Sequence, residues 1–274
     1  GIIEKSQLSD EIVISIKNRR VRNYVSEVSG SSTTYLGLFI VLAIYILCCK
    51  FLDLSSRISK TIIFLAIIFL SANLFFIGSR ISIIALLFII VFLILKGGFV
   101  FNKSLPFFFI ITAFTVLFIN SMSIDRFKEI RLENFSLNKQ KHQYNSVDTS
   151  LGVYLCATSI IKQNFVFGVG VGDTKNRLQN CYVNNLNSKV YQWQYYNTDN
   201  QFLHFFLACG LLGFLAYFLS LVFQFLHSRS RHNQNYSIII IITIIFSISE
   251  NILLRNDGLI FYSYFNALML FNNE

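Results

Sequence analysis

A nearly unbroken apolar stretch from Thr61 to Leu95 constrains the fold of this chain more than any other sequence feature. As a single helix it would reach about 52 Å, at roughly 1.5 Å per residue. The hydrocarbon core of a bilayer is only about 30 Å thick. The stretch therefore predicts two membrane spans, and Gly78-Ser79-Arg80 is the only polar break available for the turn between them.

The composition of the whole chain agrees with a membrane protein. Its 274 residues are 54% hydrophobic and only 14% charged, with a mean hydropathy of +0.57, which is too apolar for a soluble globular domain. Thirty Phe and a single Pro favour helical spans over a barrel. The net charge of +9 is better explained by basic cytoplasmic loops than by nucleic-acid binding. We expect an all-α, polytopic transmembrane bundle with no nucleic-acid partner.

The apolar runs divide the chain into four regions with about seven spans. Residues 1–34 are expected to form a membrane-surface segment, and residues 35–120 four transmembrane helices. Residues 121–200 are expected to form a large loop domain, with a buried helix from Val153 to Ile161. Residues 201–274 are expected to hold three more transmembrane helices and a short tail. The predicted spans are Tyr35–Leu52, two within Thr61–Leu95, Leu105–Asn120, Phe202–Leu226, Ser237–Ser249 and Leu259–Phe271.

The basic residues of alternate short loops predict the orientation of these spans. By the positive-inside rule, the loops that carry them are cytoplasmic. The segment 1–34, Arg80, the large loop and the turn Glu250–Gly258 then share the opposite, periplasmic face. The basic residues counted are Lys50, Arg57, Lys60, Lys96, Lys103, Arg229 and Arg231.

The cysteines show no metal-ligand spacing. Cys48, Cys49 and Cys209 lie in apolar runs, which leaves Cys156 and Cys181 outside them.

Arg80 is a candidate anion-binding residue because it lies between two apolar spans. A central arginine costs roughly 2.5 to 3.5 kcal/mol on membrane-insertion scales. Its guanidinium supplies a permanent charge and paired donors that suit phosphate oxygens. The alternative is an arginine that extends to the lipid headgroups without any further role.

Three glycines at alternate positions, Gly168, Gly170 and Gly172, form the densest glycine run of the chain. The run superficially resembles a dinucleotide-binding loop, but it lacks the G-x-G-x-x-G spacing and the preceding strand. We expect a turn between a helix and a loop, with glycines at positive φ.

The polar step Asp199-Asn200 opens directly into the apolar run that begins at Phe202. Asp199 could cap that helix, since its carboxylate can accept the first free amides. It could also act as a general base, because a carboxylate accepts a proton from a hydroxyl group. His204 lies one turn beyond Asn200 on the same helix face and is a second candidate base, although a buried structural histidine is the plainer interpretation.

In their order and spacing these motifs resemble the O-antigen ligase and O-antigen polymerase superfamily. Gly78-Ser79-Arg80 is similar to the family's Ser-Arg motif at the outer face, where the arginine handles a lipid-linked pyrophosphate. The glycine run and the Asp-Asn step resemble the end of the family's periplasmic loop. The final segment, with Glu250 and Arg255, resembles members of the Bacteroidetes type. An internal Glu250–Arg255 pair that fixes the last turn is the alternative there.

The chain departs from the family pattern at two positions. The family's candidate base is usually a His where this chain has Asp199, so Asp199 would take over that role. An Arg that usually precedes the glycines falls here at Ser150 or Leu151. Arg20 and Arg22 could compensate for it as pyrophosphate contacts, with a solvated charge run as the alternative for each.

The resemblance implies a metal-independent glycosyltransferase of the bacterial inner membrane, active at the periplasmic face and without cofactors. It would move a glycan from undecaprenyl pyrophosphate to a hydroxyl of lipid A-core, as a ligase does. A polymerase, which uses another carrier-linked glycan as acceptor, is the alternative, and a flippase or transporter is the alternative from another class. Since the chain begins in a polar segment without a Met, we expect it to be the C-terminal part of such an enzyme, with earlier spans missing.

Overall fold

Helices form all the regular secondary structure in the described parts of the chain, which confirms the predicted all-α class there. The computed structural model describes residues 23–54, 56–95, 146–186, 191, 195–231 and 233–271. The predicted span Leu105–Asn120 and both Arg20 and Arg22 lie outside these ranges. The chain divides into two units, residues 1–128 and 129–274, and each is described by itself.

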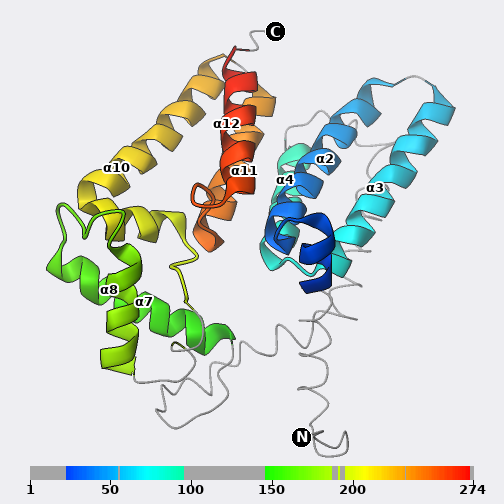
Figure 1. Ribbon diagram of the computed structural model, residues 1–274. Coiled ribbons are helices and arrows are strands. Elements are labelled where there is room, and N and C mark those ends of the chain that lie inside the picture. Colours follow the sequence, from blue (N-terminus) through cyan, green and yellow to red (C-terminus); the bar gives the residue numbers. More distant parts are fainter. Residues whose placement is uncertain are drawn as a thin grey trace, which may run out of the picture. The chain divides into compact units, whose positions relative to one another are not determined.

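Among its described residues, the first unit contains three apolar helices (Figure 1). Helix α2 packs against both of the others. Its residue Gly37 lies so close to Ser82 of α4 that a Cβ atom would collide with the serine side chain. Such small residues let two membrane helices approach closely. The helices are α2 (Thr33–Asp53), α3 (Arg57–Ile77) and α4 (Arg80–Leu95).

The break between α3 and α4 lies where the sequence predicts it. Helix α3 ends at Ile77, and Gly78 takes a φ of 64°. Helix α4 begins at Arg80, and the carbonyl of Ser79 accepts its first hydrogen bond from the amide of Ile83, at 3.2 Å. The long apolar stretch is therefore two helices.

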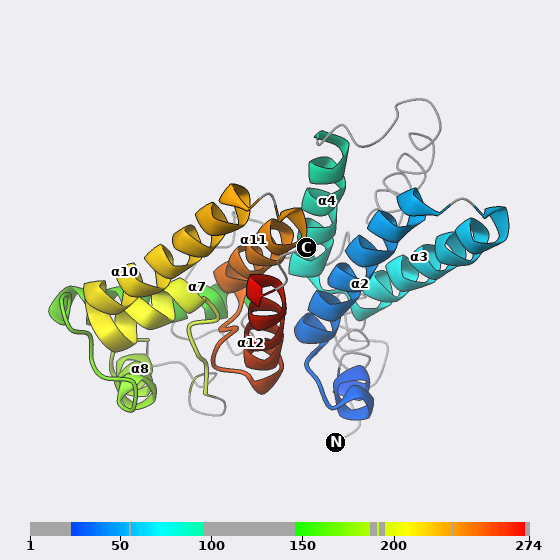
Figure 2. The same cartoon turned by 90° about the horizontal axis from the view of Figure 1, so that it is seen from above.

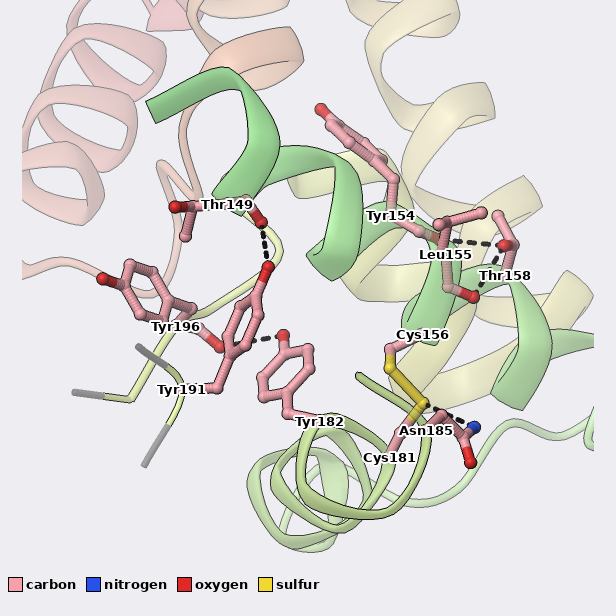
Figure 3. The surroundings of a disulfide bond; sticks show 10 residues. All are labelled: Thr149, Tyr154, Leu155, Cys156, Thr158, Cys181, Tyr182, Asn185, Tyr191 and Tyr196. Carbon is pink, nitrogen blue, oxygen red and sulfur yellow. Dashed lines mark hydrogen bonds between the residues drawn. A yellow bond between two sulfur atoms is a disulfide. The ribbon is translucent and has the colours of Figure 1, made fainter. Parts of the chain in front are cut away.

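The second unit combines a small helical subdomain with a three-helix bundle (Figure 2). In the subdomain, the disulfide Cys156–Cys181 joins α7 to the end of α8 (Figure 3). Beside it, the rings of Tyr182 and Tyr191 stack at 4.7 Å. The elements are α7 (Ser146–Gln163), α8 (Thr174–Cys181), the π-helix η4 (Tyr182–Leu186), α10 (Gln201–Ser230), α11 (Gln234–Ser249) and α12 (Asn256–Phe271).

Hydrogen bonds between side chains fasten the helices of the bundle to one another. Tyr217 of α10 pairs with Ser247 of α11 at 2.8 Å, and Ser228 pairs with Ser237 at the same distance. Such bonds satisfy polar groups that would otherwise lie unpaired in an apolar environment.

Three helices in the described ranges are long and apolar enough to cross a membrane: α2, α3 and α10. Helices α4 and α11 are apolar but shorter.

Helix α10 is not the single continuous span that the sequence predicts from Phe202 to Leu226. It breaks at Gly210, which has φ 65° and ψ −159°, a conformation open essentially to glycine alone. The break divides α10 into a first arm, residues 201–209, and a second arm, residues 211–230. Both views show the two arms running in different directions (Figures 1 and 2).

Candidate functional site

The residue that caps α10 is Asn200, which corrects the interpretation of Asp199 as the cap. The Asn200 side chain accepts a hydrogen bond from the amide of Leu203 at 2.9 Å. Asp199 comes one position earlier and has a φ of 43°. Its carboxylate is therefore not needed to satisfy the first turn of the helix.

Two amide side chains join the start of α10 to the turn between α11 and α12. The side-chain oxygen of Asn251 accepts hydrogen bonds from the Thr198 hydroxyl and from the backbone amide of Asn200, both at 3.2 Å. In the opposite direction, the side-chain oxygen of Gln201 accepts from the amide of Leu253 at 2.8 Å. These hydrogen bonds fix the residues on either side of Asp199.

Asp199 is the titratable group at the centre of this junction. Its side chain is exposed, yet the protein around it removes part of its hydration, and this raises the pKa of its carboxyl group. The positive charge of Arg255 lowers that pKa and so opposes the effect of the lost hydration. Tyr195 also lies near, because the negative charge of Asp199 adds to the effect of burial in raising the pKa of the tyrosine hydroxyl.

His204 lies on the same helix but in a different environment. It is 5% exposed, and its backbone amide donates to the carbonyl of Asn200 at 2.9 Å. Its Nδ1 atom has no hydrogen-bond partner within the described part of the chain. The exposed carboxylate of Asp199 is therefore more accessible to a substrate than this imidazole.

The glycine run docks into the break of α10 through backbone hydrogen bonds. The amides of Val169 and Gly170 donate to the carbonyls of Leu207 and Ala208, at 2.9 and 2.8 Å. In return, the amide of Leu211 donates to the carbonyl of Phe165 at 2.8 Å. The turn thus supplies partners for backbone groups that the break removes from the helical pattern.

Two of the three predicted glycines have the expected positive φ, 71° for Gly168 and 91° for Gly170. Gly172 does not, and it faces open space. A Cβ atom on Gly168 would collide with the backbone of Gly210, and one on Gly210 would collide with the backbone of Val166. This close approach, which we call the glycine seat, requires glycine on both sides.

The remaining predicted residues lie in several places. Arg80 is the half-buried first residue of α4 in the first unit. Glu250 ends α11, with its amide donating to the carbonyl of Phe246 at 2.9 Å. Arg255 directly precedes α12. The second unit therefore brings together Asp199, Asn200 and Arg255.

Sequence reasoning missed three parts of the second unit. The disulfide had a signal in Cys156 and Cys181, which lie in one loop outside the apolar runs. The break at Gly210 had a weaker signal, a glycine inside an apolar helix. The role of Asn251 had none, because its partners lie more than fifty residues earlier in the chain.

These features together define a membrane protein whose described parts are all helical, with a helical subdomain packed against α10. The O-antigen ligase family model matches residues 65–218, more than half of the chain, and the chain therefore belongs to the O-antigen ligase family. The matched range includes Arg80, the glycine run and Asp199. No curated protein and no solved structure matches the chain significantly.

Family membership supports a glycosyltransferase-like membrane enzyme of the ligase or polymerase type, acting in polysaccharide biosynthesis. Its partners are in general a lipid-linked glycan and an acceptor. Arg20, Arg22, Glu250 and Arg255 lie outside the matched range, so their likeness to the family remains a prediction.

Proposed function

We propose that this protein transfers a glycan from undecaprenyl pyrophosphate to an acceptor hydroxyl at the periplasmic face of the inner membrane. The observation that carries the proposal is the environment of Asp199. Its carboxyl group is exposed and has a raised pKa, and the Asn251 and Gln201 hydrogen bonds fix the residues on either side of it. A carboxylate with a raised pKa is a stronger base than an ordinary one.

In the proposed reaction Asp199 takes the proton of the acceptor hydroxyl as its oxygen attacks the anomeric carbon of the donor. The bond from that carbon to the pyrophosphate oxygen breaks, and the pyrophosphate leaves on its lipid carrier. The electron pair of the broken bond remains on the leaving group. Arg255 keeps Asp199 ionised over a wider pH range, because its positive charge favours the carboxylate.

The leaving pyrophosphate needs positive charge, which Arg80 is suited to supply. Arg80 occupies the first position of α4, where the helix dipole also favours an anion. A guanidinium binds phosphate oxygens through paired hydrogen bonds. Arg20 and Arg22 remain candidates for further contacts to the same group.

The disulfide supports a periplasmic position for the subdomain of α7 and α8. Disulfides persist in oxidising compartments such as the bacterial periplasm and are rare in the cytosol. The basic residues of the predicted cytoplasmic loops give the same orientation. Labelling of cysteines introduced at Lys175 and Arg229, with an impermeant reagent in intact cells, would check it. We expect labelling at residue 175 only, and labelling at residue 229 alone would reverse the orientation.

The two acceptors, lipid A-core for a ligase and a carrier-linked glycan for a polymerase, can be separated in a strain that lacks the gene. Long carrier-bound chains that fail to reach lipid A would identify a ligase. Single repeat units on the surface would identify a polymerase. Carrier-linked glycan retained on the cytoplasmic side would contradict both and indicate a flippase. Complementation with the wild-type gene is the control in each case.

A further inference from the structure

The ring contacts within α10 show how sharply this helix turns. In a straight helix Phe202 and Tyr217 would lie about 22 Å apart along the axis, at 1.5 Å per residue. Their ring centroids are 5.3 Å apart, and those of Phe205 and Tyr217 are 4.8 Å apart. The first arm of α10 therefore lies across the beginning of the second arm instead of continuing it.

The second arm alone has the length of a membrane span. Its twenty residues, 211–230, extend about 30 Å, which equals the hydrocarbon thickness of a bilayer. A bilayer that contains the whole second arm would have its boundary at the elbow at Gly210. Since the carbonyls of Leu207 and Ala208 bind the glycine run, the turn from Phe165 to Val171 lies at this same level.

This turn exposes much of its apolar surface, although the ring of Phe165 also contacts that of Phe206. Phe167 is 77% exposed and Val171 is 64% exposed, and two further apolar residues are about half exposed. The second arm of α10 also exposes apolar side chains just beyond the elbow. The residues of the turn with this exposure are Phe165, Val166, Phe167 and Val171, and those of the second arm are Leu212, Leu215 and Leu219.

Basic side chains flank the turn on both sides. Lys162 lies in the last turn of α7, and Lys175 and Arg177 lie in α8; all three are exposed. Asp173 is the only acid between Lys162 and Arg177. An apolar tip bordered by lysine and arginine is the pattern of segments that enter the interface of an anionic bilayer.

We propose that the turn Phe165–Val171 is a membrane anchor. Its apolar side chains enter the acyl-chain region of the outer leaflet beside α10. Lys162, Lys175 and Arg177 bind anionic lipid headgroups above it. The anchor holds the loop subdomain, and with it the start of α10, against the bilayer surface. This inference is independent of the proposed catalytic residues.

Tryptophan fluorescence in nanodiscs tests the anchor directly. The chain has a single tryptophan, so the background variant is Trp193→Phe. A tryptophan is then introduced by Phe167→Trp, and separately by Val171→Trp. Both positions are exposed, so neither substitution disturbs the packing. The matched control is Val183→Trp, an exposed position on η4 in the same subdomain.

Lipids brominated on their acyl chains quench tryptophan only on contact. We expect residues 167 and 171 to lose most of their emission in such nanodiscs and residue 183 to lose little. Equal, small losses at all three positions would overturn the anchor, whether the turn faces water or another protein segment. In nanodiscs with anionic lipid, Arg177→Glu should weaken the quenching at residue 167, and unchanged quenching would remove the headgroup contacts from the proposal.

Discussion

Helices α4 and α10 are each preceded by a residue with positive φ, but the residue differs. In each, a residue with positive φ lies two positions before the first helical residue, Gly78 before Arg80 and Asp199 before Gln201. Glycine adopts such a φ without strain, whereas aspartate does so at a cost. A glycine would fit the turn at position 199 with less strain, so substitutions of Asp199 can test the proposed role of its carboxylate apart from its role in the turn.

Among substitutions at the two helix starts, Asp199→Asn should lower the transfer activity most. Asparagine tolerates positive φ well, so the turn stays intact, but it cannot accept the proton. We expect glycan transfer by the purified protein to fall about 10²- to 10⁴-fold with an unchanged melting temperature.

Asp199→His should keep or raise activity, since the pKa of imidazole lies nearer the working pH. An Asn variant with normal activity would move the base role to His204 or remove it from this site.

At the start of α4, Arg80→Lys should lose most of the transfer activity although the charge remains. An ammonium group cannot reproduce the paired donors of a guanidinium on a pyrophosphate. The matched control is Arg57→Lys at the exposed start of α3, which should be nearly silent. Equal activity of the two lysine variants, at equal protein levels, would mean that Arg80 only extends to the headgroups.

The two positive-φ positions should respond oppositely to substitution. Gly78→Ala forces a Cβ into this region and should destabilise the protein by about 1 to 2 kcal/mol. Asp199→Gly removes the same strain and should leave the stability unchanged or slightly higher. Thermal unfolding in detergent measures both. A loss of stability in the Asp199→Gly variant would show that the carboxylate supports the fold.

Substituting the Asn200 cap tests whether the junction supports activity as well as stability. Asn200→Ala should cost about 0.5 to 2 kcal/mol of stability and also lower activity, since the neighbouring Asp199 loses its support. Asn233→Ala removes the equivalent cap of α11, which binds the amide of Tyr236 at 3.0 Å, and should cost similar stability without lowering activity. Equal activity in the two variants would separate the α10 cap from catalysis.

The smallest effect is a shift in pH dependence. Arg255→Gln removes a positive charge that lowers the pKa of Asp199, so that pKa should rise. Fewer carboxylates are then ionised at a given low pH, and the acid limb of the activity profile should move to higher pH. Activity measured between about pH 4 and pH 8 would show it, and a shift to lower pH would contradict the assigned role of Arg255.

The helices were largely predictable because their signals are local. The length of the stretch Thr61–Leu95 requires a break, and a Gly-Ser-Arg step within it offers one. The turn around Gly168 was predictable for the same reason, since closely spaced glycines after a helix favour positive φ.

The contacts between distant segments were not predictable from the sequence. Asn251 could equally have faced solvent, and nothing in its neighbours indicates that it binds Thr198. Asp199 and Asn200 both qualify as caps by residue type, and only the path of the backbone decides between them. The elbow at Gly210 depends on a turn made forty residues earlier, so the apolar pattern of α10 alone suggested one continuous span.

The glycine seat also limits the order in which the two segments can fold during biosynthesis. The ribosome makes the turn at Phe165–Gly170 before α10, so the donors for the Leu207 and Ala208 carbonyls exist when that helix emerges. Until the two segments meet, the elbow would leave these backbone carbonyls without partners within the protein. A straight nascent helix satisfies these carbonyls by its own hydrogen bonds, so it is more stable than a bent one until the turn docks. Bending should therefore be a late step in assembly, completed only after the second arm has inserted.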